Sequence, residues 1–368
     1  MKLLYTLLLC SSISFTVVAQ SSPWQSPLMI ATSTDGLNFN PPSVFQDSSG
    51  VATVLNLGGD TLISAFQWFP SPMNSTYWDK IAVKFSYDGG ATWTSPISCN
   101  FTGLPGGFQR PFDPALVELS NGQLRMYFST GPTGPTAGAI DTYSATSTDG
   151  INYTVESNAR VNHATYNCID PTVALFNSVW YYNAWTSNQT DGHHRATSTD
   201  GLNFTVGAMN AYDGSHLWLG NYYVDGSTLR FYGCGSGMWT TSSTDGVTWS
   251  SYQNISLMGA DPAVTKNDAG TYIMIYTGPP NLSSIADASQ NLSVRVYPNP
   301  ANGKFTVRCT QTGSTFRMYN TQGEVVMVRN LTSTCTDIYT QGILRGVYYY
   351  EVQTAEGELQ KGKLVITN

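Results

Sequence analysis

Four aspartates stand at the start of stretches that have the apolar alternation of β-strands. Asp113, Asp170 and Asp261 each precede a proline, and Asp213 begins an Asp-Gly-Ser-His segment that ends at His216. Paired carboxyl groups can perform acid–base chemistry, because one carboxylate activates a water molecule while a second, protonated group donates a proton. A neighbouring carboxylate helps to hold one of them protonated near neutral pH. Such chemistry requires a fold that brings these side chains together.

A short motif with the features of a hairpin tip recurs five times. It reads Ala-Thr-Ser-Thr-Asp-Gly-Leu-Asn-Phe at 31–39, with close copies at 145–153, 196–204 and 241–249 and a longer copy at 84–93. Asp-Gly between alternating strands is typical of a tight turn, because the carboxylate accepts turn N–H groups and glycine adopts a positive φ. We therefore interpret the five aspartates as turn-stabilising residues and not as catalysts: Asp35, Asp88, Asp149, Asp200 and Asp245.

The aspartates of the first paragraph belong to a second motif that alternates with the hairpin motif. Three copies begin with Asp-Pro, and degenerate copies begin at Gly50 and Asp213. Each copy predicts two strands, and the hairpin aspartates are 53, 61, 51 and 45 residues apart, which suits four-stranded propeller blades. The repeats open with half a blade at 28–40 and end with half a blade at 261–278, and pairing these halves leaves no long free edge. We predict an all-β protein: a five-bladed β-propeller closed by pairing of its N- and C-terminal half-blades, followed by a small β-sandwich.

The composition divides the chain into four parts. Residues 1–19 have the Lys2 start, apolar stretch and small residues of a signal peptide. The predicted propeller, 20–278, holds eight basic and eighteen acidic residues, and a linker at 279–292 is rich in Pro, Asn, Ser and Ala. Residues 293–368 hold eight basic and five acidic residues in short alternating strands. No later stretch is long and apolar enough to span a bilayer, so we expect no integral membrane segment after signal removal.

The chain of 368 residues has 11% charged residues, 12% aromatic residues and a net charge of −7. This composition is typical of a secreted β-protein, and it lacks the basic field that nucleic-acid binding requires. Cys99, Cys168 and Cys234 have no metal-ligand spacing, and we interpret them as buried thiols. Cys309 and Cys335 could pair across two strands. We expect no cofactor and no catalytic metal, and leave open a structural calcium ion at the propeller hub.

Three short motifs follow one another in residues 293–368. They are Val296-Tyr-Pro-Asn-Pro300 with Gly303, then Gly346-Val-Tyr348, then Lys363-Leu-Val-Ile366. In this order they resemble the C-terminal sorting domain of the bacterial type IX secretion system. The resemblance implies a Gram-negative bacterium of the Bacteroidetes type, export through the periplasm, and recognition of residues 293–368 by the type IX machinery. The protein would then be secreted or attached to the outer surface.

The segments around Phe112-Asp113-Pro114, Ile169-Asp170-Pro171 and Tyr212–Leu217 also resemble a known family. They are similar to units of five-bladed glycoside hydrolases of the arabinanase and xylosidase type. The resemblance implies that Asp113 is the general base, Asp170 the orienting carboxylate and Asp213, or a histidine, the acid. In an inverting mechanism the base and the acid are about 6.5–9.5 Å apart. Asp213 replaces the family's glutamate, and neither Glu118 nor Glu156 suits the acid role.

Further residues are candidates for binding a sugar ligand. Arg110 is close to the first aspartate, His163 and His216 can bind hydroxyl groups, and Trp185 and Trp218 offer stacking surfaces. Asp261 repeats the Asp-Pro motif. Each has a structural alternative: the aspartates as strand-start staples, the histidines as ordinary hydrogen-bonded residues and the tryptophans as blade core.

Three functions compete. The leading hypothesis is a secreted type IX cargo whose propeller hydrolyses polysaccharide by an inverting mechanism. The alternative is a non-catalytic glycan-binding or surface protein on the same propeller, which the missing glutamate favours. A sialidase-like enzyme is a third hypothesis, because Ser86–Trp93 resembles the Asp-box of sialidase propellers. Its site would need an arginine triad, and only Arg110 stands near an inner-strand start.

Overall fold

The structure, a computed structural model, describes residues 26–133, 138–188, 190–279, 294–309, 312–320, 322–353 and 359–367. Every helix or strand assigned in these residues is a β-strand, which confirms the all-β prediction. The predicted signal peptide at 1–19 and residues 280–292 of the predicted linker lie outside the described residues. No helix in the described ranges has the length and hydropathy of a membrane span. The chain divides into two compact units, Met1–Trp68 with Asp79–Pro280, and Phe69–Trp78 with Asn281–Asn368.

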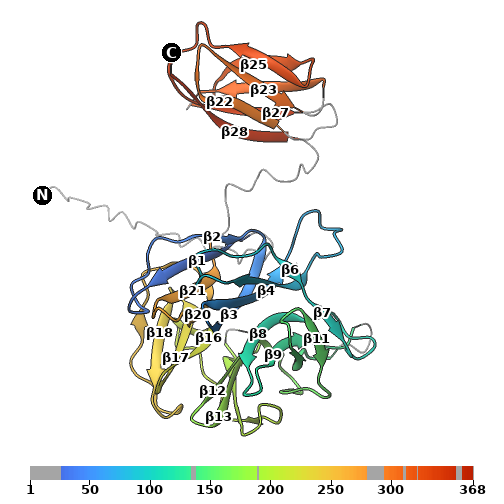
Figure 1. Cartoon of the computed structure of the whole chain (residues 1–368), viewed down its shortest axis with the longest axis vertical. Helices are drawn as coiled ribbons and strands as arrows, with labels where there is room; N and C mark the ends of the chain where they lie inside the picture. Colours follow the sequence, from blue (N-terminus) through green and yellow to red (C-terminus); the bar gives the residue numbers. More distant parts are fainter. Residues whose placement is uncertain are drawn as a thin grey trace, which may run out of the picture. The chain divides into compact units, whose positions relative to one another are not determined.

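The described strands of the first unit form five sheets, each antiparallel except where β7 joins β11 (Figure 1). The first sheet has the strand order β3 (Ser49–Gly58), β4 (Thr61–Trp68), β5 (Lys80–Ser86), β6 (Ile97–Ser98), and the second has β8 (Phe112–Glu118), β9 (Leu124–Thr130), β10 (Asp141–Ser147), β11 (Asn152–Val155), β7 (Asn100–Thr102). The third sheet has the order β12 (Ile169–Phe176), β13 (Val179–Trp185), β14 (His193–Ser198), β15 (Thr205–Val206), and the fourth has β16 (His216–Asp225), β17 (Thr228–Gly235), β18 (Trp239–Ser243), β19 (Gln253–Asn254). The fifth sheet has the order β20 (Ala260–Lys266), β21 (Tyr272–Thr277), β1 (Leu28–Ser33), β2 (Ser43–Gln46).

The last of these sheets joins the two ends of the unit. β1 pairs antiparallel with β21, from Leu28 opposite Thr277 to Ser33 opposite Tyr272. Figure 1 shows β1 beside β21, although about 240 residues separate them in the sequence. Pairing satisfies the backbone groups of both strands, which would otherwise be exposed edges.

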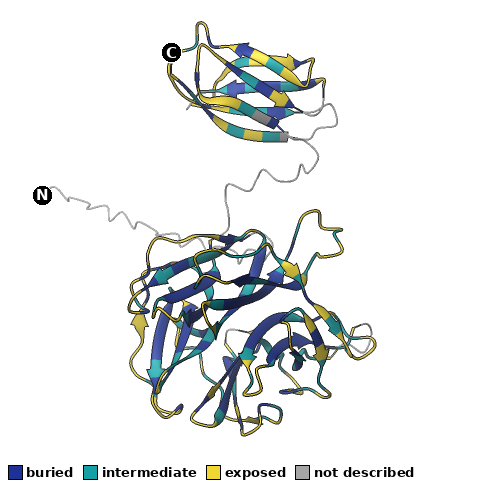
Figure 2. Cartoon of the chain, in the orientation of Figure 1, coloured by how far each residue is buried: buried dark blue, intermediate teal, exposed yellow. Residues whose placement is uncertain are grey.

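The strands β3, β8, β12, β16 and β20 lie at the centre of the first unit, and we call them the inner strands. Each contacts the next in this order, and β20 contacts β3. A cavity of about 440 Å³ is lined by residues from all five. Apolar side chains fill the space between neighbouring sheets, as with Phe66 of β4 and Ile275 of β21, both fully buried. Figure 2 shows long stretches of the strands of the first unit coloured as buried. The starts of the inner strands therefore come from distant parts of the sequence but belong to neighbouring elements.

Four of the five Asp-Gly turns share one hydrogen-bond pattern, and in the longer turn Asp88 Oδ1 accepts the Ser86 hydroxyl and the N–H of Thr92. In the turn after β10, Ser147 Oγ donates to Asp149 Oδ1 at 2.9 Å, and the same oxygen accepts the backbone N–H groups of Ile151 and Asn152 at 2.8 Å. Gly150 has a φ of +74°, a conformation that glycine adopts without strain. These bonds lower the pKa of Asp149 below its ordinary value, backbone N–H donation by Asn152 most strongly. The carboxylates are thus used within the turns, as predicted.

The second unit is one seven-stranded sheet around its own core. The strand order is β25 (Val325–Leu331), β24 (Ser314–Tyr319), β27 (Gly346–Gln353), β28 (Leu359–Ile366), β22 (Val294–Asn302), β23 (Lys304–Cys309), β26 (Cys335–Tyr339). Phe305 and Phe316, from different parts of the sheet, are fully buried with ring centroids 5.7 Å apart. The core therefore contains side chains from both β23 and β24.

The described cysteines form no disulfide with one another. Cys99, Cys168 and Cys234 are buried, as predicted. Cys309 and Cys335 do not pair, because the register places Cys335 opposite Arg308. Neighbouring residues of a strand point to opposite faces, so the thiol of Cys309 is buried while Cys335 is exposed.

Candidate active site

Bulges near the starts of three inner strands place aspartates outside the hydrogen-bonded ladder. In β8, β12 and β20 the register shifts across Asp113-Pro114, Asp170-Pro171 and Asp261-Pro262. The aspartates have φ values of +51°, +49° and +48°. Aspartate tolerates this left-handed region better than most residues, and proline suits a bulge because it has no N–H for the ladder.

The three aspartates form one group, which we call the aspartate cluster. The backbone N–H of Asp170 donates a hydrogen bond to Oδ2 of Asp113 at 3.3 Å. Asp113 is 5% exposed, whereas Asp170 and Asp261 are partly exposed. Repulsion between the carboxylates adds to the effect of burial, so the electrostatics of the three residues are linked.

The carboxyl groups of the aspartate cluster have pKa values above the ordinary value for aspartate. Burial raises the pKa of Asp113 to about 6, although the hydrogen bond from the Asp170 N–H opposes it. Burial and the Asp113 carboxylate raise the pKa of Asp261 to about 7. Burial and the charges of its two neighbours raise the pKa of Asp170 well above its ordinary value. Protonated and ionised carboxyl groups therefore coexist near neutral pH, which acid–base chemistry requires.

Asp213 lies outside this cluster. Its Oδ1 accepts the backbone N–H groups of Ser215 at 2.9 Å and of His216 at 2.8 Å. Burial acts to raise its pKa, but these bonds and the His216 side chain outweigh burial and lower the pKa of Asp213 to about 2. Among the described residues, no direct interaction joins Asp213 to the cluster. Asp213 is therefore ionised at neutral pH.

The register of β16 explains the separation. In this strand the ladder is interrupted between Leu217 and Gly220, so Trp218 stands where the Asp-Pro dipeptide stands in β8, β12 and β20. Asp213 is five residues earlier, in the turn before the strand. The fourth copy of the motif thus matches the others in sequence order but not in strand register.

His216 is the partner of Asp213. Its Nδ1 lies 2.8 Å from Oδ2 of Asp213. Its ring stacks on Tyr252, with centroids 3.9 Å apart, and contacts the edge of Trp239. The carboxylate accepts a hydrogen bond from Nδ1–H in this geometry, so the ring is oriented with Nε2 available for a second interaction.

His163 has the opposite hydrogen-bond arrangement. Its Nδ1 accepts the backbone N–H groups of Thr165 at 3.1 Å and of Tyr166 at 3.2 Å. Its ring packs on Tyr166 and lies 5.3 Å from the ring of His194. Because two donors face Nδ1, this nitrogen acts as an acceptor and the ring N–H is at Nε2.

Arg110 does not pair with Asp113. Its guanidinium forms an ion pair with Asp79, and it also donates to the backbone carbonyl of Asp79. Gln67 donates to the same Asp79 carboxylate. The Arg110 side chain is 45% exposed, so part of it remains open to a ligand.

The two predicted stacking tryptophans differ. Trp218 is 6% exposed and packs against Phe231, Trp239 and Trp249, so it belongs to the core. Trp185 ends β13, opposite Ile169, and is partly exposed. Of the two, Trp185 alone has a surface that a ligand can reach.

The glutamates of the first unit have no place in this cluster. Glu156 accepts two hydrogen bonds from the Arg125 guanidinium, at 2.8 and 2.9 Å, and one from Ser144 at 2.6 Å. Glu118 is exposed at the far end of β8 and lines the 440 Å³ cavity. Glu156 is therefore committed to a structural ion pair.

Sequence reasoning missed two features. Asp261 was predicted only as a ligand contact, but the structure makes it a full member of the aspartate cluster. Its Asp-Pro motif, the same as at Asp113 and Asp170, was a usable signal. Asp141, at the start of β10, has a pKa raised to about 6 by burial, which outweighs a hydrogen bond from the His163 backbone. No motif in the sequence marks Asp141.

Comparison with known families identifies the domain in the second unit. Residues 295–367 match the family described as the secretion system C-terminal sorting domain. The second unit carries a type IX sorting domain. Proteins with this domain are exported by the type IX system and are secreted or attached to the outer surface, so the predicted localisation is confirmed. A search of curated proteins finds no match.

Several solved structures are similar to this chain. A family 117 glycoside hydrolase of Zobellia galactanivorans has 13% identity and a TM-score of 0.48, covering 70% of this chain and 91% of that chain. An alpha-L-arabinofuranosidase of Clostridium thermocellum has 13% identity and a TM-score of 0.47, covering 78% and 95%. An exo-beta-1,3-galactanase of Phanerochaete chrysosporium has 10% identity and a TM-score of 0.45, covering 92% and 99%.

Proposed function

We propose that this type IX cargo is a glycoside hydrolase acting on polysaccharide, and that its first unit is a five-bladed β-propeller closed by the sheet β2-β1-β21-β20. The observation that carries the proposal is the aspartate cluster. Three repeats far apart in the sequence supply carboxyl groups to one place, with pKa values raised toward neutrality. Groups of this kind are suited to proton transfer at physiological pH.

Asp113 and Asp170 act on one side of the scissile bond in this proposal. The backbone N–H of Asp170 bonds to Oδ2 of Asp113 and the two carboxyl groups interact electrostatically, so we assign them to one side and not to the two roles of an inverting pair, which are about 6.5–9.5 Å apart. Asp113 accepts the backbone N–H of Asp170 with Oδ2, a contact that favours its ionised form, so we assign it as the base that activates water. Asp170 orients Asp113 and tunes its charge.

The proton donor on the other side is His216, oriented by Asp213. Asp213 cannot supply the proton itself, because it is ionised at neutral pH. Its carboxylate instead accepts the Nδ1–H of the His216 ring and holds the ring in one orientation, and we assign His216 Nε2 as the donor to the leaving oxygen. The carboxylate that replaces the family's glutamate thus contributes through a histidine.

A non-catalytic glycan-binding protein is the second candidate, and one observation favours it. Val51 in β3 adopts a φ of +45°, close to the φ values of the three aspartates, at the corresponding register shift. The bulge is therefore a backbone feature that does not require a carboxylate. If the protein only binds glycans, the Asp-Pro dipeptides stabilise the strand starts, and the site binds sugar without turnover.

A substrate screen separates the two candidates. The mature protein is incubated with aryl glycosides and with plant and algal polysaccharides, and reducing ends are measured together with binding. We expect release of reducing ends by the wild type and its loss in Asp113→Asn and Asp170→Asn variants that retain the native melting temperature. Binding without release on every substrate would favour the second candidate. Release that survives both substitutions would exclude the proposed residues.

A further inference from the structure

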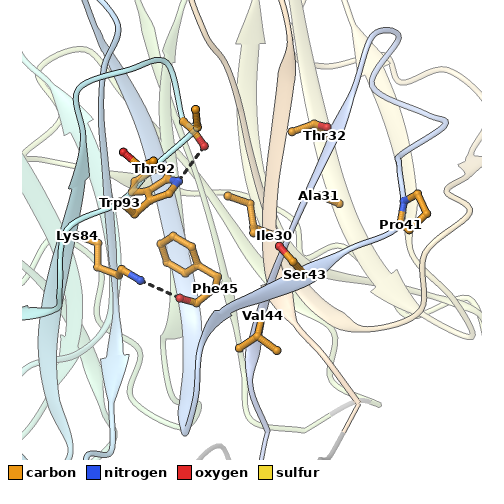
Figure 3. Close-up of a pocket in the computed structure, with 12 residues that line it drawn as sticks. Ile30, Ala31, Thr32, Pro41, Ser43, Val44, Phe45, Lys84, Thr92 and Trp93 are labelled. Carbon is orange, nitrogen blue, oxygen red and sulfur yellow. Dashed lines mark hydrogen bonds between the residues drawn. The ribbon is translucent and has the colours of Figure 1, made fainter. Parts of the chain in front are cut away.

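A second cavity, of about 500 Å³, lies on the first unit between two neighbouring sheets (Figure 3). One side is formed by residues of β1, by Pro41 and by residues of β2, and the other by Lys84 of β5 and the turn after it. No residue of the aspartate cluster lines it. Its volume is in the range of pockets that hold small ligands.

Trp93 forms a fixed aromatic wall of this cavity. Its indole N–H donates to the backbone carbonyl of Gly90 at 3.2 Å. Its ring meets the buried Phe45 edge to face, with centroids 5.1 Å apart and an interplanar angle of 88°. The ring is half-buried, so a face held in place by two contacts remains partly open (Figure 3). A held aromatic face of this kind suits the apolar C–H face of a sugar ring.

Lys84 brings a positive charge into the same cavity. Its Nζ donates to the Phe45 carbonyl at 2.8 Å and lies 4.4 Å from the centre of the Phe45 ring. An ammonium group has three donors, and this hydrogen bond uses one of them. No carboxylate is among the residues that line the cavity. A partly buried cation without an acidic partner is stabilised by an anionic ligand.

The charge of the cavity contrasts with its surroundings. Residues 20–278 hold eight basic and eighteen acidic residues, and the aspartate cluster repels anions. The hydroxyl of Ser43, on an exposed segment of the cavity wall, adds a polar group suited to sugar hydroxyls. Aromatic face, cation and hydroxyl together fit a ring that carries an acidic group.

We propose that this cavity binds an acidic saccharide residue, whose carboxylate or sulfate group pairs with Lys84 and whose ring lies against Trp93. The inference rests on the proposed function only for the choice of a saccharide as ligand. An acidic unit of a polysaccharide would be held here, while the aspartate cluster accepts a neutral unit. The cavity is thus a binding site separate from the hydrolytic one.

Isothermal titration of the full chain tests this proposal. The probes are tetragalacturonate, its fully methyl-esterified neutral form, and a sulfated galactotetraose, and the Asp113→Asn background prevents turnover. We expect an acidic probe to bind, with at least tenfold weaker binding in Lys84→Met and retained binding in Lys84→Arg. Lys80→Met removes an exposed charge from the same strand and should leave binding unchanged. Trp93→Phe, which keeps an aromatic ring, should weaken binding less than Lys84→Met.

The two acidic probes distinguish a carboxylate from a sulfate ligand. Equal binding of the neutral ester, or equal loss in Lys80→Met and Lys84→Met, would overturn the inference. So would the failure of both acidic probes to bind. Lys84-dependent binding in a protein that hydrolyses none of the screened substrates would uphold the cavity while rejecting the proposed function. Hydrolysis that depends on Asp113, without any effect of Lys84 on binding, would support the proposed function and reject the cavity as a binding site.

Discussion

The backbone N–H of Asp170 donates a hydrogen bond to Oδ2 of Asp113, although the residues are 57 positions apart and belong to different sheets. The contact joins the starts of two inner strands. The charge of Asp261, from a third sheet, acts on the same pair. Three Asp-Pro repeats therefore meet at one place, where their carboxyl groups influence one another.

The cluster should make stability fall as pH rises. An unfolded aspartate has a pKa of about 3.9, whereas burial raises that of Asp261 to about 7, so the folded state binds the proton more tightly. This contribution is full below about pH 4 and is lost as pH rises through about 7. We expect Asp261→Asn to gain roughly 1–3 kcal/mol relative to the wild type between pH 5 and pH 8. Urea unfolding at both pH values measures it, with the exposed Asp47→Asn as control. An unchanged pH dependence would show that Asp261 titrates normally.

His216 should matter most for poor leaving groups. A proton donor is needed when the departing oxygen is basic, so His216→Ala should reduce kcat/KM on unactivated glycosides by roughly 10²–10³-fold. On a dinitrophenyl glycoside, whose leaving group needs no proton, the loss should be small. Asp213→Asn should follow the same pattern with a smaller effect, because it only orients the ring. Equal losses on both substrates would exclude His216 as the donor.

The aspartates of the Asp-Gly turns should contribute to the stability of the fold but not to catalytic activity. Asp149→Ala removes an acceptor used by the N–H groups of Ile151 and Asn152, which should cost about 1 kcal/mol of unfolding free energy. Asp149→Asn retains a side-chain oxygen and should cost less. Turnover at a temperature where both variants are folded should equal that of the wild type. A folded Asp149→Ala variant without activity would assign this turn a direct role.

The repeats made much of the fold predictable. The hydrogen bonds of an Asp-Gly turn are made within a few residues, so the sequence around Asp149 is sufficient to predict the turn. The same holds for the three Asp-Pro bulges. Asp213 could not be placed in this way, because its distance from the cluster depends on the register of β16, where Trp218 occupies the corresponding position. The raised pKa of Asp141 depends on burial by residues far away in the sequence, which no local motif encodes.

The sorting domain should direct export. Removal of residues 295–367, which match the sorting family, should leave the first unit in the periplasm. Fractionation followed by immunoblotting measures the distribution, and fusion of the same residues to a periplasmic reporter is the matched gain-of-function test. Appearance of the truncated protein outside the cell in normal amounts would contradict this role.

The value of kcat/KM for the Asp113→Asn variant tests most directly whether the aspartate cluster performs hydrolysis. Asparagine keeps the size of the side chain and an oxygen for the Asp170 N–H, so the fold should persist. We expect a fall of about 10³-fold or more on the best substrate, with an unchanged melting profile. Activity equal to that of the wild type in a folded Asp113→Asn protein would contradict it.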